Sequence, residues 1–351
     1  AEKSRLSRTI DPAGAVTSYA YDPVGNRVAT TDAVGNAAFS AYDELNRMIE
    51  FTDRLGGRTL YSYDAVGNLT QVIDPLGRTE QYSYDPLDRP LSRTDALGAT
   101  ETVAWDLEGN RIQVTDALGQ TTHYEHDALG REIRQIDSLG NVRQTQYDAM
   151  DNVVRITDKN GRVRRFEYDA LDRLTNEQWW DGTDLVQSIQ FTYDAAGNPL
   201  TAEDAFSAYH FTYDALNRMA SQDNQGRPDG PSMTLVYSYD AAGRVLAVSD
   251  ALGTQVQSSY DPRGLLLSRT WAGGAVDPVR VDFAYDILGR RTGTRRYADS
   301  GTASLIGRTT FAYDAVERLT DLTHHDAADA VLADYDFVRD LADQLTAIQH
   351  H

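Results

Sequence analysis

The sequence predicts an all-β fold, a repeat array of antiparallel β-hairpins. An aromatic-Asp dipeptide recurs every 21 residues between Tyr21-Asp22 and Tyr168-Asp169. A second series of aspartates lies half a period away, so a turn signal appears about every ten residues. The six or seven residues between turns have the length of a strand and are too short for a helix. Self-similarity at a fixed period is the mark of a repeat architecture.

The dipeptide series is strictly regular at first and then loosens. The regular copies are Tyr21-Asp22, Tyr42-Asp43, Tyr63-Asp64, Tyr84-Asp85, Trp105-Asp106, His126-Asp127, Tyr147-Asp148 and Tyr168-Asp169. The later copies are Tyr193-Asp194, Tyr213-Asp214, Tyr239-Asp240, Tyr260-Asp261, Tyr285-Asp286 and Tyr313-Asp314. Tyr335-Asp336 is interpreted as a degenerate last copy.

Each aspartate is predicted to open a hairpin turn. An Asp carboxylate at the first turn position accepts hydrogen bonds from backbone N–H groups that follow it. The fourth position needs a positive φ, which Gly adopts freely and Asn or Asp tolerate. Glu317 is the exception among the dipeptide turns. Positive φ is therefore expected at Gly25, Gly67, Gly109, Gly130 and Gly197.

The strand that enters each dipeptide turn shows an aromatic face. The residue two before the dipeptide is aromatic in ten of fourteen copies, as at Tyr61 and Phe191. Residues two apart on a strand share a face. The residue after the fourth turn position alternates between Asn and Arg, beginning with Asn26 and Arg47. The sequence offers no physical reason for this alternation.

The longer connections fall at the half-period turns, which a meander places on one rim. They run over 179–184, 223–232, 271–278 and 297–307. We expect a repeat array over 1–320, regular over 11–178 and irregular with rim insertions over 179–320. Residues 321–351 are expected to be a degenerate terminal repeat or a cover, with a short helix or irregular segment over 326–349. His350-His351 is interpreted as a tag remnant, and the chain as a piece of a longer protein.

Charge and composition exclude several function classes. The net charge of −20 disfavours binding to a nucleic-acid backbone. It equally disfavours binding to a membrane surface through a polybasic segment. No apolar run approaches the length of a membrane span. Cysteine is absent, so there is no disulfide, thiolate nucleophile or cysteine metal site.

The chemistry of the remaining residues favours a structural protein over an enzyme. Nearly every Asp is explained by a turn, and neither catalytic residues nor cofactors are predicted. His123 and His126 lie on opposite faces of one strand, which disfavours a shared metal. The turns lack the converging oxygen ligands of calcium-binding repeats. Trp179, Trp180 and Trp271 stand outside the aromatic register, in or beside the irregular loops, and are the candidate ligand contacts.

The chain resembles the YD repeats of the RHS family, found in bacterial polymorphic toxins, toxin-complex shell proteins and teneurins. The resemblance rests on segments such as Tyr63-Asp64-Ala65-Val66-Gly67-Asn68 and Asp74-Pro75-Leu76-Gly77-Arg78, and it covers about 9–320. It implies a ribbon that spirals into part of a hollow β-shell around a toxin or other cargo polypeptide. Some members cut themselves in a closing segment. Asp261-Pro262-Arg263-Gly264-Leu265 superficially resembles part of that segment, but it is in register as an ordinary repeat turn and is given no catalytic role.

The resemblance also implies partners and location. We expect a non-catalytic shell segment of an exported or cell-surface bacterial protein, assembled in the producing cell. Its partners would be the cargo and flanking YD repeats, with end-to-end self-association of an open ribbon. Two alternatives stay open: a glycan- or cell-surface-binding repeat module, and a β-propeller with blades of about 42 residues.

Overall fold

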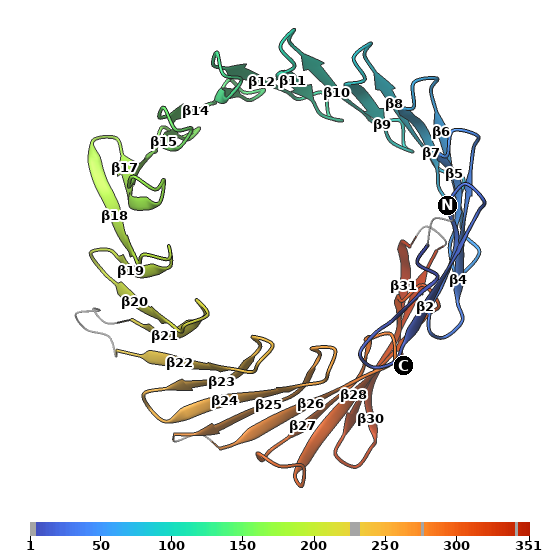
Figure 1. Ribbon diagram of the computed structural model, residues 1–351, viewed down its shortest axis with the longest axis vertical. Helices are drawn as coiled ribbons and strands as arrows, with labels where there is room; N and C mark the ends of the chain where they lie inside the picture. Colours follow the sequence, from blue (N-terminus) through green and yellow to red (C-terminus); the bar gives the residue numbers. More distant parts are fainter. Residues whose placement is uncertain (1–4, 225–231, 275–276, 341–342) are drawn as a thin grey trace. The chain divides into compact units, whose positions relative to one another are not determined.

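The computed structural model describes residues 5–224, 232–274, 277–340 and 343–351. Within them the chain is all β: the 31 strands form one antiparallel sheet and there is no helix (Figure 1). The predicted fold class is therefore confirmed. The contacts divide the chain into two units. Unit 1 comprises residues 1–82, 240–247 and 252–351, and unit 2 comprises residues 83–239 and 248–251.

The strands are short and follow one another without interruption by other elements. Those up to the end of the regular repeats are β1 (Arg8–Ile10), β2 (Val16–Tyr21), β3 (Arg27–Thr31), β4 (Ala37–Tyr42), β5 (Met48–Thr52), β6 (Arg58–Tyr63), β7 (Leu69–Ile73), β8 (Thr79–Tyr84), β9 (Pro90–Thr94), β10 (Thr100–Trp105), β11 (Arg111–Thr115), β12 (Thr121–His126), β13 (Glu132–Ile136), β14 (Val142–Tyr147), β15 (Val153–Thr157), β16 (Val163–Tyr168) and β17 (Leu174–Asp181). The later ones are β18 (Asp184–Tyr193), β19 (Pro199–Glu203), β20 (Ala208–Tyr213), β21 (Met219–Asp223), β22 (Thr234–Tyr239), β23 (Val245–Asp250), β24 (Thr254–Tyr260), β25 (Leu266–Gly273), β26 (Val279–Tyr285), β27 (Arg291–Tyr297), β28 (Leu305–Tyr313), β29 (Leu319–Asp326), β30 (Val331–Arg339) and β31 (Leu345–His350).

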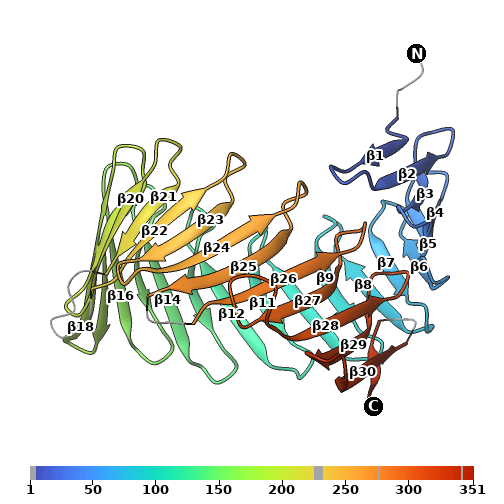
Figure 2. The same ribbon diagram turned by 90° about the horizontal axis from the view of Figure 1, so that it is seen from below.

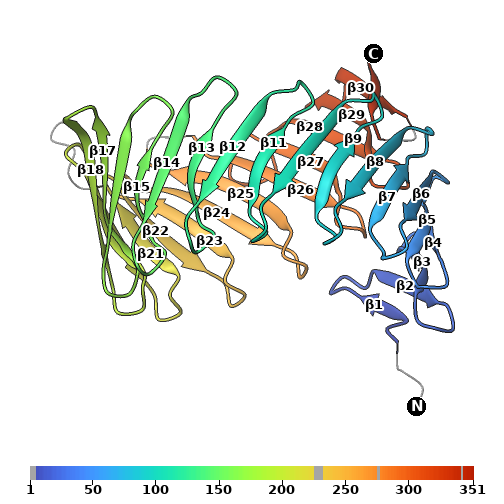
Figure 3. The same cartoon turned by 90° about the horizontal axis from the view of Figure 1, so that it is seen from above.

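Within each unit, consecutive strands pair antiparallel with one another. In unit 1, β24 to β30 lie in chain order (Figure 2), and in unit 2 the same holds for β11 to β15 (Figure 3). A single 31-stranded sheet is incompatible with the β-propeller alternative, because propeller blades are separate four-stranded sheets. The propeller alternative is therefore wrong.

The sheet is one layer thick and has almost no interior. Among the described residues, only Val163 and Tyr297 are buried apolar side chains, at 8% and 6% exposed. Buried polar residues such as Asp32 and Thr309 outnumber them. Stacked sheets and bundles are held together by a hydrophobic core. This sheet must instead depend on backbone ladders and on contacts between neighbouring hairpins.

Two expectations about the irregular regions need correction. Trp179 and Trp180 lie inside β17 and Trp271 lies inside β25, because these hairpins lengthen as paired strands instead of opening into loops. The short helix expected over 326–349 is wrong, since β30 and β31 continue the ladder there. The connections over 223–232 and 271–278 include residues 225–231 and 275–276, which lie outside the described residues. The boundary at residue 320 stays a prediction.

The turn residues have the predicted backbone. Gly25, Gly67, Gly109, Gly130 and Gly197 have φ between 76° and 115°. Asn and Asp occupy the same position in other turns with φ near 60°, as at Asn46 and Asp88. These conformations are costly for residues with a larger side chain.

Glu317 adopts φ 73° at this position, where the other dipeptide turns have Gly, Asn or Asp. Its carboxylate accepts a hydrogen bond of 2.5 Å from Arg54, a residue of unit 1 that lies 263 positions earlier. Arg54 is also 3.6 Å from the carboxylate of the buried Asp32. The unusual turn residue therefore ties the late hairpins of unit 1 to its early ones.

The turn conformation gives a direct test at Gly197. A Cβ built there meets nothing within 4 Å, so substitution changes only the backbone preference. Gly197→Val should lower the free energy of unfolding by roughly 1 kcal/mol more than Gly197→Asn, because β-branched residues tolerate positive φ poorly. Thermal denaturation of both variants measures the difference, and equal stability would contradict the assigned turn.

Candidate functional site

The repeated feature of the molecule is the aspartate turn. In the turn at Asp43, the backbone N–H of Asp43 donates to the carbonyl of Arg47 at 2.9 Å, closing the hairpin. One carboxylate oxygen accepts hydrogen bonds from the N–H groups of Leu45 and Arg47, both at 2.9 Å. The half-period turn at Asp53 has the same arrangement. The carboxylates are thus used to hold backbone N–H groups that the ladder leaves unpaired.

In several of these turns, hydrogen bonds and ion pairs lower the pKa of the carboxyl. The backbone N–H of Arg47 is the main cause of the low pKa of Asp43, and the guanidinium of Arg131 is the main cause for Asp127. In the half-period turn at Asp137, the ammonium of Lys159, 2.9 Å away, lowers the carboxyl pKa to about 2. Carboxylates held ionised in this way are poor general acids at neutral pH.

Successive hairpins separate at the rim that carries the aromatic-Asp turns. Between β5 and β6 the backbone pairing reaches only Glu50 opposite Leu60 and does not extend to the turns. The aromatic of the dipeptide spans the gap, since the hydroxyl of Tyr63 donates to the carbonyl of Met48 at 2.8 Å. The same bond recurs at Tyr42, Tyr147, Tyr168, Tyr193, Tyr239, Tyr260, Tyr285 and Tyr313, and the indole N–H of Trp105 replaces it in its repeat.

An arginine bridge joins one turn to the next at the same rim. Arg47 donates through Nε to the carboxylate of Asp43 at 2.7 Å and through Nη1 to the backbone carbonyl of Asp64, in the following turn, at 2.9 Å. Its guanidinium lies 4.9 Å from the ring centroid of Tyr63, within the range of a cation–π contact. Equivalent bridges start at Arg89, Arg131, Arg173, Arg244, Arg290 and Arg318.

Asparagine makes a shorter bridge in several of the turns where it takes the place of arginine. Asn26 donates to its own Asp22 at 2.9 Å and to the side-chain oxygen of Asn46 in the next turn at 2.8 Å. Asn152 reaches Asp172 and Asn198 reaches Asn217 in the same way. An Asn is too short for the backbone carbonyl that Arg reaches, so it depends on an Asn or Asp at the fourth position of the next turn. The alternation corresponds to two lengths of bridge in these turns, but not at Asn110, whose side-chain amide donates to its own Asp106 and whose next turn has Gly130 at the fourth position.

The turn at Asp261 shows that the bridge does not depend on one sequence position. Leu265 stands where other turns have Asn or Arg, and it has no side-chain donor. Arg263, two residues earlier, donates through Nε to Asp261 at 2.8 Å and through Nη1 to the carbonyl of Asp286 at 2.9 Å. The segment 261–265 is thus an ordinary repeat turn with a relocated bridge.

The two faces of the sheet differ in chemistry. The dipeptide aromatics and the aromatics two residues earlier are half-buried, whereas the residues between them are exposed. On the exposed face, hydroxyl groups of directly opposed residues form pairs: Thr192 with Thr201 at 2.7 Å, and Ser259 with Ser268 at 2.6 Å. We call this the hydroxyl face.

Two of the three candidate tryptophans line a hollow in unit 2. It has a volume of about 480 Å³ and lies where β17 and β18 extend past the half-period turn of β15 and β16. Trp179 is 42% exposed, and its indole N–H donates to Glu177 at 2.7 Å. Trp271 is not among the lining residues. The lining consists of Arg143, Ile156, Asp158, Arg162, Val163, Arg164, Trp179, Trp180, Asp181 and Val186.

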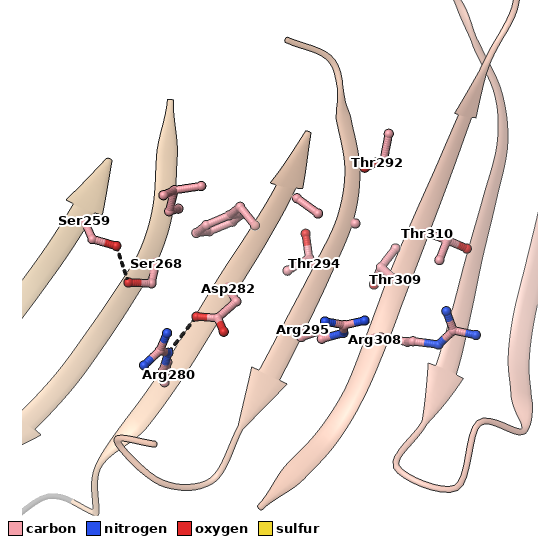
Figure 4. Close-up of a pocket in the computed structure, with 14 residues that line it drawn as sticks. Ser259, Ser268, Arg280, Asp282, Thr292, Thr294, Arg295, Arg308, Thr309 and Thr310 are labelled. Carbon is pink, nitrogen blue, oxygen red and sulfur yellow. Dashed lines mark hydrogen bonds and ion pairs between the residues drawn. The ribbon is translucent and has the colours of Figure 1, made fainter. Parts of the chain in front are cut away.

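A second hollow of about 490 Å³ lies in unit 1, across β24 to β28 (Figure 4). Sequence reasoning missed it, because its polar residues come from five strands that no local motif connects. Hydroxyl groups and the guanidinium groups of Arg280, Arg295 and Arg308 surround it, with Asp282 as its one carboxylate.

Histidines and acidic residues do not gather into a metal site in the described ranges. Nor does any helix there have the length and apolar character needed to cross a membrane. His126 occupies the aromatic slot of its repeat, half-buried, and pairs with Glu132 across the hairpin bulge.

Comparison with protein families defines the class of the chain. The RHS Repeat family model matches residues 3–37, 42–79, 63–100 and 239–276, and the Teneurin YD-shell family model matches residues 102–257. The chain belongs to the YD-repeat (RHS) family. No curated protein matches the sequence.

Solved structures share this fold. The crystal structure of TcdB2-TccC3-TEV matches with a TM-score of 0.77 and 16% identity, over 96% of this chain and 22% of that one. TcdB2-TccC3-Cdc42 gives a TM-score of 0.77 and 16% identity over 97% and 22%, and TcdB2-TccC3 gives 0.50 and 14% over 96% and 27%. This chain thus spans about a quarter or less of the solved chains, and at these identities the likeness shows the fold alone.

The relocated bridge predicts a rescue. Arg263→Ala should lower the Tm by about 2–4 °C, the shift that accompanies a loss of roughly 1 kcal/mol in a domain of 150–250 residues. Adding Leu265→Arg to that variant should restore much of the Tm, because Arg at this position makes the bridge in other turns. Calorimetry of wild type, both single variants and the double variant measures the effect. If the Tm of the double variant stays as low as that of Arg263→Ala, the bridge cannot be made from position 265.

The lowered carboxyl pKa values set the direction of acid unfolding. A carboxyl whose pKa is lower in the folded than in the unfolded protein stabilises the fold at pH values above its unfolded pKa. That stabilisation is lost as the pH falls through the folded pKa. The unfolding free energy should therefore stay level above about pH 5 and fall between about pH 4 and 2. The pKa of Asp137, followed by carboxyl carbon NMR, should lie near 2 and rise in Lys159→Met but not in Lys159→Arg. An Asp137 that titrates near 4 in the wild type would contradict the ion pair.

Proposed function

We propose that the chain is a wall segment of a YD-repeat shell that encloses a toxin or other cargo polypeptide and keeps it apart from the producing cell until delivery. The observation that carries the proposal is the single-layer sheet with almost no buried apolar side chains. A protein whose sheet covers no core of its own has a face free to surround something else. The family membership and the shared fold support the same role.

The proposed role is non-catalytic. The turn aspartates accept two or more hydrogen bonds each, and several, such as Asp43 and Asp127, have lowered pKa values, so they serve the backbone. The proposed setting is an exported or cell-surface bacterial protein. Its further partners would be flanking YD repeats, which would pair with the outer edges of β1 and β31.

Protease protection of the cargo tests enclosure in the complete protein. The bridge variant carries Arg47→Ala, Arg89→Ala and Arg131→Ala, each of which removes a contact between turns. The control carries Arg8→Ala, Arg143→Ala and Arg162→Ala, which remove the same charge without touching a bridge. Cargo should resist protease in the wild type and the control and be cut in the bridge variant. Cargo that is cut as readily in the wild type as in the bridge variant would refute enclosure.

The chain itself provides a test of the non-catalytic role. Purified protein should show no hydrolase, nuclease or self-cleavage activity, and its mass measured by light scattering should rise with concentration as sheet edges pair. Turnover that disappears on substitution of one Asp or His would overturn the structural role. A constant monomer mass would overturn edge pairing alone.

A second candidate function is glycan binding at the hollow beside Trp179. An exposed indole next to Asp158, Asp181 and Arg164 combines an apolar platform with hydrogen-bonding groups, as carbohydrate sites require. Trp179→Ala should abolish retention on a glycan array, whereas Trp271→Ala, outside this hollow, should leave it unchanged. Retention that is the same in both variants would exclude this site.

A further inference from the structure

We infer that the hollow across β24 to β28 is a binding site for an acidic polypeptide segment, which it would hold through carboxylate–guanidinium pairs. The inference rests on the arrangement of the lining residues and holds whether or not the chain encloses a cargo. Three arginines line this hollow, although the chain as a whole has a net charge of −20.

The register places the charged residues in one row on the hydroxyl face. Ser268 lies opposite Asp282, Asp282 opposite Arg295, and Arg295 opposite Arg308. Directly opposed residues on neighbouring strands share a face and have Cβ atoms about 5 Å apart. Arg295 and Arg308 are therefore two like charges side by side, as Figure 4 shows. Such a pair destabilises a sheet unless an anion lies between the two charges.

The nearest anions already pair with two of the three lining arginines. Arg280 donates to Asp282 at 2.6 Å, and Arg308 donates through Nε to Asp329 at 2.6 Å. Arg295 is exposed and has no hydrogen bond or ion pair with any described residue. Its planar guanidinium offers a bidentate contact to a carboxylate that reaches the hollow from outside.

The floor of the hollow admits a chain segment. Ala284 lies opposite Gly293, so the two residues beside the charged row have little or no side chain. The hydroxyl of Thr310 lies opposite Gly293, and the paired hydroxyls of Ser259 and Ser268 lie on the other side. The volume of about 490 Å³ exceeds that of a single carboxylate and falls within the usual range for ligand sites.

A peptide fits better than a nucleic acid. A short acidic segment needs to supply only one or two carboxylates, because Arg280 and Arg308 already pair with Asp282 and Asp329. Arg295 is then the lining cation without a partner among the described residues. A nucleic acid carries one phosphate charge per nucleotide, and the net charge of −20 on the chain would repel it.

Titration with labelled hexaglutamate at low salt tests the proposal, with hexaglutamine as the uncharged control. Fluorescence anisotropy should show hexaglutamate binding that weakens with salt and no hexaglutamine binding. Arg295→Glu should weaken hexaglutamate binding about tenfold or more, because it removes a cation and adds a repelling charge. Arg8→Glu, an exposed strand arginine outside the hollow, makes the same charge change and should have little effect.

A second variant separates the shape of the hollow from its charge. Gly293 has an ordinary strand φ, and a Cβ built there approaches Ala284 no closer than 3.6 Å. Gly293→Val should therefore fold, fill the floor and weaken hexaglutamate binding without a change in charge. Binding that is insensitive to both Arg295→Glu and Gly293→Val would overturn the site. Tighter binding of oligothymidylate with the same dependence on Arg295 would overturn the peptide as its ligand.

Discussion

The structure depends on the bridge between consecutive turns. Sequence-adjacent strands are paired over only part of their length, and each pair of hairpins separates at the rim beyond residues such as Glu50 and Leu60. A two-layer protein would close such gaps with a core, but this sheet has almost none. The hydroxyl of Tyr63 and the guanidinium of Arg47 replace the missing ladder with bonds to backbone carbonyls. Because the acceptors are backbone atoms, the bridge constrains the donors and leaves most other side chains free to vary.

The repeated aspartate combines two tasks in one side chain. One carboxylate oxygen accepts the N–H groups of its own turn, and the other accepts the donor that continues to the next turn, as at Asp43 with Arg47. The turn and the bridge are therefore coupled, since an Arg that lost its Asp would lose the orientation that directs it to the next carbonyl. Asp261 performs both tasks as well, although its bridging arginine, Arg263, follows it by two residues instead of four.

The sequence predicted what local chemistry determines. Strand length, hairpin turns and positive φ at positions such as Gly67 follow from residues a few positions apart, and the structure has them as expected. The bridges could not be derived, because Asn26 and Asn46 lie 20 positions apart and their contact depends on how hairpins stack. The contact between Arg54 and Glu317 is beyond any local pattern, although Glu317 was visible as the exception in its series. Trp179 was misplaced in a loop, since nothing local distinguishes a longer loop from a longer hairpin.

The nearest-neighbour character of the bridges has a mechanical consequence. In unit 2 the side-chain bonds between hairpins join adjacent hairpins, as Arg89, Arg131 and Arg173 do. A pulling force on the chain would load these links one after another instead of sharing the load among them. Each hairpin of 21 residues that detached would release about 70 Å of extended chain and leave the next hairpin intact. A sheet joined in this way would peel apart from an edge one hairpin at a time.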